Sequence, residues 1–395
     1  MQQTIQQKKF SQYLHHEHLV ELPYDQELLL KNQALQSYAH DKHWPASCRP
    51  VIPSPRPRQY RTLSKRAIVR HGERILWQRA GSRDEADRRL EAEGHGALYD
   101  FILSFLAKPG YRELTRHVNY VIIRGNYETF CVLLNVDQMN NIVVRKCKLL
   151  AQHLQQAALG VSAAFIYFDP SRSEYYLESE RPPAAVSYKK LFGSQLLQLG
   201  IRGLKLAYEA TAFSQINQSI LPAFIDAAES MLMPQPEQRL IDLYCGYGFF
   251  SHLLGERYAQ VWGVDVNSEA IKSARLNQER LHPDRRMHFE ALAIDGRVVR
   301  RGLPKIDGRR EAMVLDPPYQ GTEAAVIPAL AERCAERVLH IFCNVDRVQT
   351  ELALWQNHGY RIHAIQPLDL FPATAHIEIM ALMEREGMNR VAEKN

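Results

Sequence analysis

Three side chains that could take part in catalysis lie where apolar, strand-like runs begin or end. Cys343 follows RVLHIF, Asp316 follows EAMVL, and Glu378 opens the run EIMALMER near the end of the chain. Ligands of open α/β sheets bind outside the carboxyl ends of the parallel strands, so we expect these side chains to meet at one sheet edge. Two prolines directly after Asp316 end its strand and fix the loop that carries the carboxylate. The pattern therefore predicts a site that combines a thiol with two carboxyl groups.

A thiol and a carboxylate together suit methylation of a pyrimidine at carbon. C5 of uracil is too weakly nucleophilic to attack a methyl donor unaided, but a thiolate that adds to C6 creates an enolate whose C5 can do so. A base must then remove the C5 proton so that the thiol is eliminated. We assign the first role to Cys343 and the second to Glu378. The plainer alternatives are a small buried cysteine and a surface ion pair between Glu378 and His376.

A glycine-containing turn predicts a nucleotide-type ligand site upstream of these residues. The strand-like run RLIDLYC is followed by Gly246, Tyr247 and Gly248, and the next run, QVWGVDV, ends at Asp265. An acid at the end of the second strand can accept hydrogen bonds from two ribose hydroxyls. The turn lacks the GxGxxG pattern that grips a pyrophosphate, which favours the adenosine of S-adenosyl-L-methionine over NAD. A tight turn beside a surface acid is the structural alternative, and Ser268 is expected to cap the next helix.

The elements that position these residues read as an α/β domain. Beyond about residue 235, short apolar runs alternate with helical patterns, as expected of a parallel sheet with crossover helices. Two further strands, RIHAIQPLDLF and HIEIMALMER, close the chain.

The preceding part of the chain has a different pattern of predicted helices and strands. We expect a helix over 25–38, an extended Pro/Arg segment after it, a helix over 84–107, a hairpin around Gly125-Asn126, a helix near 144–158 and the strand AAFIYF. This mixture predicts an α+β domain. The expected boundaries are an N-terminal segment over 1–45, the α+β domain over 46–205 and the α/β domain over 206–395.

Composition excludes several protein classes. Hydrophobic residues make up 46% and charged residues 24% of the 395, as in an ordinary folded protein rather than a fibrous or disordered one. No apolar run reaches the ~20 residues of a membrane helix, and the first residues lack a secretory signal. The six cysteines are scattered without a CxxC pair, so no disulfide framework, metal site or iron–sulfur cluster is indicated. We expect a cytoplasmic protein.

The distribution of charge suggests a polyanionic partner. The net charge is only +5, but the stretch from Arg49 to Arg70 holds basic and no acidic side chains, and a second basic stretch runs from Arg285 to Arg310. A charge run is often just a solvated face, yet two of them in a balanced chain favour a phosphate backbone. The candidate contacts to RNA are Arg56, Arg58, Arg61 and Arg66.

The segment from about 206 to 385 resembles the RNA 5-methyluridine methyltransferase family, the (uracil-5-)-methyltransferases of tRNA and rRNA. The motifs that carry the resemblance occur in family order: FSQIN, DLYCGYGFF, GVDVN, LDPPYQG, HIFCNVDRVQTEL and DLFPATAHIEIMAL. The resemblance implies a class I methyltransferase fold, Rossmann-like and mostly parallel with an antiparallel last strand, preceded by an α+β RNA-recognition domain. It also implies S-adenosyl-L-methionine as the donor and tRNA or rRNA as the partner, without membrane, metal or iron–sulfur cluster.

The same resemblance implies roles for single residues. Cys343 matches the nucleophile and Glu378 the base, while Phe213 and Tyr319 are candidates to stack on an unstacked target base. The residues that match the donor contacts are Gln215, Tyr244, Gly246, Asp265 and Asp316. Three positions depart from the family: Tyr319 stands where it has arginine, Phe249 where asparagine is usual, and Val345 in place of proline.

Two other functions fit parts of the sequence. Asp316-Pro317-Pro318-Tyr319 also matches the motif with which amino-methyltransferases hold an adenine or guanine amine, a reaction that needs no cysteine. The three departures also fit an RNA-binding protein with little or no turnover. Replacing Cys343 distinguishes the first alternative, because only carbon methylation needs the thiol. Methyl transfer to RNA distinguishes the second.

Overall fold

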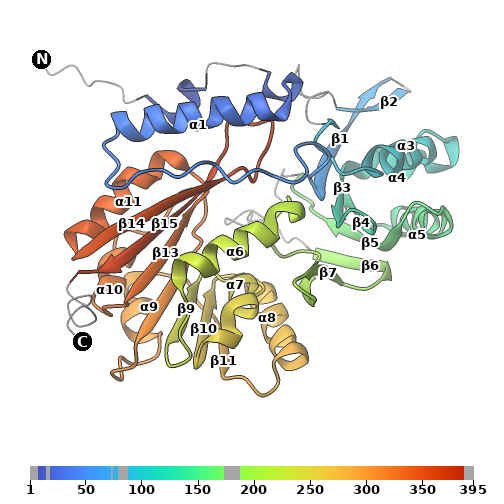
Figure 1. Cartoon of the computed structure of the whole chain (residues 1–395). Coiled ribbons are helices and arrows are strands. Elements are labelled where there is room, and N and C mark those ends of the chain that lie inside the picture. Colours follow the sequence, from blue (N-terminus) through green and yellow to red (C-terminus); the bar gives the residue numbers. More distant parts are fainter. Residues whose placement is uncertain (1–7, 15–17, 73, 79–87, 173–186, 387–395) are drawn as a thin grey trace, which may run out of the picture. The chain divides into compact units, whose positions relative to one another are not determined.

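The structure is a computed structural model that describes residues 8–14, 18–72, 74–78, 88–172 and 187–386. Its contacts divide the chain into two compact units (Figure 1). Unit 1 contains residues 1–57, 200–206 and 219–395, and unit 2 contains residues 58–199 and 207–218. These boundaries differ from those we expect from the sequence, because the N-terminal segment belongs to the same unit as the C-terminal half.

Unit 1 is built on a seven-stranded sheet with the strand order β11-β10-β9-β12-β13-β15-β14. Only β15 runs antiparallel to its neighbours, which confirms the class I methyltransferase fold expected from the sequence. The strands are β9 (Arg239–Leu243), β10 (Gln260–Asp265), β11 (Met287–Ala291), β12 (Glu311–Leu315), β13 (Arg337–Phe342), β14 (Tyr360–Leu368) and β15 (Glu378–Arg385).

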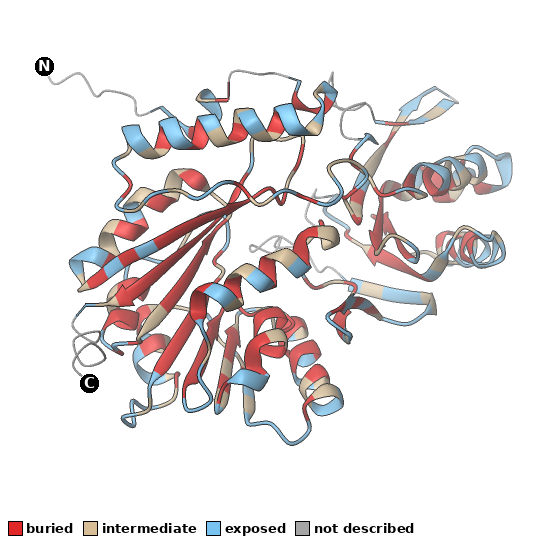
Figure 2. Ribbon diagram, in the orientation of Figure 1, coloured by how far each residue is buried: buried red, intermediate tan, exposed pale blue. Residues whose placement is uncertain are grey.

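Helices cover the sheet of unit 1 and bury its apolar residues (Figure 2). They are α1 (Tyr24–Asp41), α6 (Leu221–Leu232), α7 (Phe249–Leu254), α8 (Ser268–Leu281), α9 (Gly296–Arg301), α10 (Val326–Ala331) and α11 (Val345–Asn357). Leu35 and Tyr38 of α1 belong to the same hydrophobic core as Phe342 and Trp355. Packing against this core, rather than intrinsic propensity, accounts for most of the stability of such helices.

The Pro/Arg segment is extended as predicted only in its first part, where residues 48–52 lie along the edge strand β14, and it bends at residues 55 and 57–59, with a left-handed backbone at Gln59 (φ +54°). Cys48 and Ile52 form parallel bridges with Ile365 and Leu368. The amide of Ile52 donates to the carbonyl of Pro367 at 2.9 Å. The segment therefore satisfies the outer edge of the sheet, which would otherwise present unpaired backbone groups.

Unit 2 has a six-stranded sheet with the order β2-β1-β3-β4-β5-β6, in which only β4 and β5 are parallel. Its strands are β1 (Leu63–His71), β2 (Arg74–Trp77), β3 (Val118–Gly125), β4 (Phe130–Val136), β5 (Val161–Phe168) and β6 (Ser187–Gly193). Its helices are α3 (His95–Leu106), α4 (Arg112–His117) and α5 (Asn141–Gln156). A hairpin of β7 (Leu196–Ile201) and β8 (Leu204–Glu209) contributes residues to both units.

The predicted hairpin around Gly125-Asn126 is confirmed as β3 and β4. The helix expected over 84–107 is shorter, because α3 begins at His95, and residues 79–87 lie outside the described part. Among the described residues, no helix combines the length and apolar character needed to cross a membrane.

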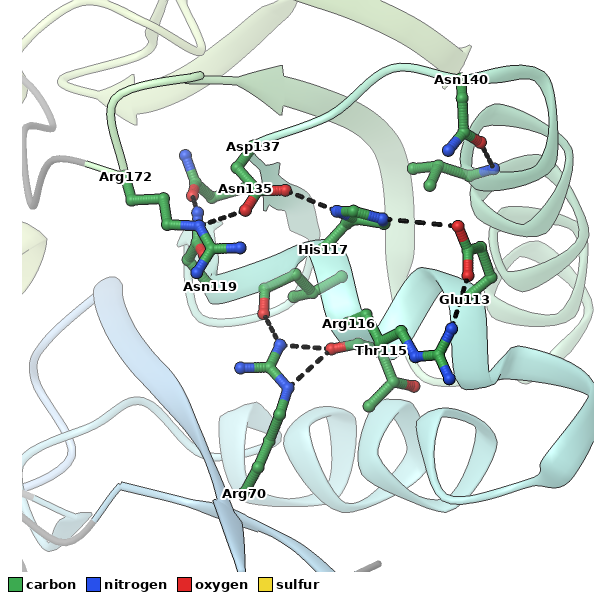
Figure 3. A network of polar contacts seen from close by, with 12 residues as sticks. Arg70, Glu113, Thr115, Arg116, His117, Asn119, Asn135, Asp137, Asn140 and Arg172 are labelled. Atoms are coloured by element: carbon green, nitrogen blue, oxygen red, sulfur yellow. Dashed lines mark hydrogen bonds and ion pairs between the residues drawn. The ribbon is translucent and has the colours of Figure 1, made fainter. Parts of the chain in front are cut away.

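Polar contacts fix the helix–strand connections of unit 2 (Figure 3). Arg70 of β1 donates to the carbonyls of Thr115 and Val118, where α4 passes into β3. His117 lies 2.8 Å from Asp137 at the end of β4, and Asp137 also binds Arg172. The network holds the ends of the strands in place.

The sequence predicts Ser268 as the N-cap of α8, but in the structure the N-cap is Asn267. The Asn267 side chain accepts from the amides of Glu269 at 3.0 Å and Ala270 at 3.2 Å. Ser268 is instead the first helical residue. Both types cap helices well, so the local sequence does not discriminate between them.

We expect Asn267→Ala to lower the free energy of unfolding of the ligand-free protein by about 1 kcal/mol, because two helix amides lose their acceptor. Ser268→Ala, the matched control, should change it by less than about 0.5 kcal/mol. Urea unfolding followed by circular dichroism measures both. A larger loss for the serine variant would contradict the assignment.

Candidate functional site

Strand pairing brings Cys343 and Glu378 together. Phe342, the last residue of β13, pairs with Ile379 of the antiparallel strand β15. The residues one step further along, Cys343 and Glu378, are therefore neighbours across the two strands. The Glu378 side chain is 2% exposed, whereas Cys343 is partly exposed. Cys343 is thus the more accessible of the two residues.

Cys343 lines a small pocket at the carboxyl edge of the sheet. Its Sγ lies 4.0 Å from the carbonyl oxygen of Pro317, in the loop that follows Asp316. Tyr319, with 53% of its surface exposed, lines the same pocket. The remaining lining residues are Pro317, Pro318, Gly321, Phe342, Asn344 and Arg347.

The acidic groups near Cys343 disfavour further negative charge. Burial, followed by the carboxyl groups of Glu378 and Asp316, raises the pKa of the Cys343 thiol. Burial and then Asp316 raise the pKa of Glu378 well above its ordinary value. Burial, with Asp242 and Asp265, raises the pKa of Asp316 to about 7. The site therefore favours the protonated forms of these groups, and a bound cation would reverse that preference.

The glycine turn follows β9 and meets the ends of two adjacent strands. Leu243 pairs with Val264 of β10 and with Leu315 of β12, so Tyr244, Asp265 and Asp316 follow three neighbouring strands. The structure thus brings together the donor-site candidates of unit 1.

The turn itself holds Asp265 in a fixed position. The amide of Gly246 donates to one carboxylate oxygen of Asp265 at 2.9 Å, and the amide of Asn267 donates to the other at 2.7 Å. Gly246 has a left-handed backbone with φ of +56°, and a Cβ there would meet no atom within 4 Å. Tyr244 is also left-handed, with φ of +62°, which a non-glycine residue adopts at some cost. The turn therefore leaves open space beside an oriented acid, as a bound nucleoside would require.

Two of the three departures from the family, Phe249 and Val345, have structural explanations, and nothing in the structure explains Tyr319. Phe249 is buried, and its ring packs against Phe250 and Phe224 at centroid distances of 5.0 and 6.3 Å. Val345 is the first residue of α11, a position that proline favours but does not require. Asn344 caps this helix by accepting from the amide of Asp346 at 3.1 Å.

Glu351 of α11 fixes the loop that carries Tyr319, and the sequence gives no sign of this. Its carboxylate accepts from the amide and the hydroxyl of Thr322 at 3.1 and 3.2 Å. A Cβ on Gly321 would lie 2.0 Å from the same carboxylate. Only glycine therefore fits at that position of the PPYQG loop.

Gln215 and Phe213 belong to unit 2, so the structure describes them apart from the cluster in unit 1. Phe213 is 56% exposed and Gln215 is partly buried. Arg124, buried in β3, holds their segment by donating to the carbonyls of Ala210 at 2.6 Å and Ala212 at 3.0 Å. This arginine is missed from the sequence because its partners lie far along the chain.

The four arginines predicted to contact RNA differ in their surroundings. Arg66 forms an ion pair with Glu91, lies 4.1 Å from the centre of the Tyr99 ring and has only 11% of its side chain exposed. Because Arg66 is paired with Glu91 inside the protein, we no longer include it among the candidate contacts to RNA. Arg56 is exposed in unit 1, whereas Arg58 and Arg61 are partly exposed in unit 2.

Unit 2 also carries a basic pocket of about 330 Å³ between α5 and β6. Arg145, Lys148 and Lys189 line it and are exposed. Helix α5 contains no acidic residue, which is the signal in the sequence that could have predicted this surface. Within the described ranges, no group of three or more His, Cys, Asp or Glu side chains is arranged to hold a metal ion.

The raised pKa of Asp316 predicts how stability depends on pH. An unfolded aspartate has a pKa near 3.9, so between about pH 4 and pH 7 the native protein binds the extra proton and loses stability as pH rises. Asp316→Asn removes this loss, and its free energy of unfolding should exceed that of the wild type by about 1 kcal/mol or more at pH 8. The gap should shrink at pH 5 in urea titrations. Asp284→Asn, at an exposed position, is the control, and an equal gap at both pH values would contradict the prediction.

Comparisons with known proteins agree with this fold. Residues 185–386 match the tRNA (Uracil-5-)-methyltransferase family. An uncharacterized RNA methyltransferase of Thermosynechococcus vestitus is 31% identical over 194 residues, and the 23S rRNA (uracil(1939)-C(5))-methyltransferase RlmD of Alkalilimnicola ehrlichii is 31% identical over 188 residues. The matches cover 49% and 47% of this chain, but only 42% and 41% of those proteins. The chain thus spans less than half of these relatives.

Among solved structures, the tRNA (uracil-54, C5)-methyltransferase of Pyrococcus abyssi, in complex with S-adenosyl-L-homocysteine, is similar with a TM-score of 0.66. The alignment covers 92% of this chain and 84% of that one at 18% identity, which supports the fold. The family match spans half of the chain and includes the glycine turn, the PPYQG loop, Cys343 and Glu378. The chain therefore belongs to the tRNA (uracil-5-)-methyltransferase family.

Proposed function

We propose that this chain methylates C5 of a uridine in tRNA or rRNA, with S-adenosyl-L-methionine as the methyl donor. Cys343 is the proposed nucleophile and Glu378 the proposed base. The observation that carries the proposal is the pairing of Phe342 with Ile379. This pairing makes Cys343 and Glu378 neighbours at the sheet edge that also holds the glycine turn.

The proposed steps balance without another reactant. The Cys343 thiolate adds to C6, and the electron pair of the C5–C6 double bond passes to the enolate. C5 would then form a bond to the methyl carbon of the donor, while the bond between that carbon and the donor sulfur breaks and leaves its electron pair on the sulfur, giving S-adenosyl-L-homocysteine. Glu378 then accepts the C5 proton, the double bond re-forms and the C6–S bond breaks to return the thiolate. A carboxyl group with a raised pKa suits this role, because its ionised form is the stronger base.

The acidic surroundings support a cationic donor. Burial, and then the neighbouring carboxyl groups, raises the pKa of Asp242 and of Asp316, so a bound cation would favour their ionised forms. When bound, S-adenosyl-L-methionine supplies a methyl group on a positively charged sulfonium. Asp265 would hold its ribose, with Tyr244, Gly246 and Asp316 lining the donor site. The anionic pyrophosphate of NAD would meet repulsion there.

Recognition of the target base is proposed for the aromatic candidates. Tyr319 offers an exposed ring in the pocket of Cys343, and Phe213 offers a second exposed ring. A base inside folded RNA must first be unstacked, at a cost of a few kcal/mol that stacking on such rings offsets. The roles of Phe213 and of Gln215 as a donor and target contact rest on the resemblance.

Two basic surfaces are proposed to bind the RNA backbone. The first comprises Arg58 and Arg61 of unit 2, and Arg56 of unit 1 is a separate candidate contact. The second comprises Arg145, Lys148 and Lys189, whose pocket is lined by no acidic residue. Cationic side chains of this kind bind phosphates independently of base sequence and set the register of the RNA.

We expect Cys343→Ala to abolish 5-methyluridine formation, because no other group supplies a thiolate at that strand end. Glu378→Gln should still form the C6 adduct but release it slowly, since a neutral amide cannot accept the C5 proton. Nucleoside mass spectrometry of treated RNA measures the product, and a slower-migrating RNA–protein band on a denaturing gel measures the adduct.

Cys334→Ala, which removes an exposed cysteine, is the matched control for the thiol and should retain wild-type turnover. Methylation of adenine or guanine that survives Cys343→Ala would favour the amino-methyltransferase alternative. Binding of RNA without transfer of a methyl group by the wild type would favour a binding protein.

Replacing Arg58 and Arg61, or the three residues of the second surface, by glutamine should weaken RNA binding and reduce the slope of log K against log salt by about 0.7 for each lost phosphate contact. Fluorescence anisotropy over a series of salt concentrations measures the slope. Arg310→Gln is the control, because this arginine is already paired with Glu237 and Glu336. An unchanged slope would remove that surface from the proposed interface.

A further inference from the structure

Helix α1 buries a lysine that no step of the proposed reaction uses. The Lys31 side chain is 0% exposed, and its Nζ lies 2.7 Å from Glu27 Oε1 and 2.7 Å from Asp369 Oδ1. Burying a charged group carries a desolvation penalty that its ion pairs and hydrogen bonds must offset. A buried ion pair is therefore weak evidence that Lys31 serves only to stabilise the fold. Its partners indicate what it does instead.

The Lys31 network fastens the loop over 369–377, which joins β14 to β15. Lys31 Nζ binds Asp369 at the start of this loop and donates to the carbonyl of Phe371 at 3.4 Å. The amide of Ala373, in the middle of the loop, donates to Glu27 at 2.5 Å. Helix α1 therefore binds the loop at three successive points.

Tyr24, at the start of α1, completes the network. Its hydroxyl donates to the second carboxylate oxygen of Asp369 at 3.0 Å and accepts from the amide of Ser54 at 2.6 Å. Both oxygens of Asp369 thus have partners on α1, which fixes the orientation of the carboxylate and not only its distance.

This loop ends directly at Glu378. Ala373 has a left-handed backbone with φ of +63°, so the loop follows a path that a non-glycine residue resists without outside contacts. The loop is also held by the amide of Asp369, which donates to the carbonyl of Ile52 at 2.9 Å, and by the hydroxyl of Thr374, which donates to the carbonyl of Phe371 at 2.7 Å. Helix α1 supplies the charged contacts of the loop that leads into β15.

The other half of α1 contacts the segment after Cys343. The Tyr38 hydroxyl donates to Asp346 at 2.9 Å, and the amide of Phe10, before the helix, donates to the same carboxylate oxygen at 2.8 Å. Asp346 lies in the first turn of α11, shortly after Cys343. Figure 1 shows α1 beside the ends of β14 and β15 and near α11.

We propose that α1 positions the catalytic pair, and that Lys31 is a positioning residue for Glu378, acting through the loop over 369–377. This inference rests on the proposed function, because it assigns Lys31 to the step in which Glu378 takes the C5 proton. An ion pair restricts the direction and register of the groups it joins more than an apolar contact of the same area does. Fixing the register is the best-attested role of buried charged groups in proteins. Lys31 touches the loop of the base and not the strand of the nucleophile.

The inference predicts a defect in one step only. Lys31→Met should slow proton removal from C5 by about tenfold to a hundredfold, as small misplacements of a catalytic group do. Addition of the thiol and methyl transfer should change by less than about threefold. The covalent adduct then accumulates on ordinary RNA, as it should in Glu378→Gln.

RNA that contains 5-fluorouridine separates the steps. Its C5 carries fluorine in place of the proton, so the adduct persists in every active variant and its rate of formation reports only the steps before the base acts. The probe is bulk RNA from cells that lack this gene, grown with and without 5-fluorouracil. Gln36→Met, at an exposed position of the same helix, is the matched control.

We expect Lys31→Met to form the fluorinated adduct at nearly the wild-type rate, yet to release 5-methyluridine slowly from ordinary RNA with a visible RNA–protein band. Equal losses on both RNAs would reduce Lys31 to a structural role and overturn the inference, as would full turnover by a folded variant. If Lys31→Met does not fold, Tyr24→Phe, which removes two hydrogen bonds but no charge, must show the same split in weaker form.

The reference variants distinguish the two failures. If wild-type protein methylates uridine and Glu378→Gln traps the adduct, the proposed function stands and the Lys31 result alone decides the inference. If Cys343→Ala still makes 5-methyluridine, or Glu378→Gln forms no adduct on either RNA, the proposed function fails, and the assignment of Lys31 fails with it.

Discussion

The register between β13 and β15 is the constraint on which the candidate site depends. Side chains alternate between the faces of a strand, so a slip of one residue would turn Glu378 away from Cys343. The seven residues from Glu378 to Glu384 are all buried, and a strand covered on both faces carries no alternation of polarity to fix its pairing. The loop before the strand must therefore contribute to the register, and this loop is held by α1.

Burial of several acids beside one thiol gives the site its electrostatic character. In the ligand-free protein the raised pKa values of Cys343 and Asp316 keep negative charge low. A cation bound at the glycine turn would stabilise the thiolate and the carboxylates together, because the same low dielectric strengthens attraction as well as repulsion. Under the proposed function, activation of the Cys343 thiol would thereby be coupled to binding of the donor, which would limit reactions of a free thiolate with other electrophiles.

Most of the sheet in unit 1 could be predicted from the sequence, because parallel strands covered on both faces appear as short apolar runs between helical patterns. The residues at the ends of those strands, such as Asp265 and Cys343, then follow from topology alone. Partners distant along the chain leave no local pattern. Arg66 resembles its exposed neighbours in composition until Glu91 is found beside it, and Lys31 occupies an ordinary position of a predicted helix. The choice between Asn267 and Ser268 as a cap likewise depends on backbone angles that either type can adopt.

Helix α1 contacts the segments next to Cys343 and Glu378, although it lies far from them in the sequence. The six motifs that carry the family resemblance lie after residue 206, and the helix over YDQELLLKNQALQ resembles the family only loosely. Lys31 of that helix nevertheless contacts Asp369 across 338 residues of sequence, and Tyr38 contacts Asp346 across 308. Contacts between such distant segments pay their loop-closure entropy before they stabilise anything, so they tend to form late in folding. The loop before Glu378 is then ordered only once both ends of unit 1 have met. On this argument the alignment of Cys343 with Glu378 depends on contacts from α1 as well as on the motifs after residue 206.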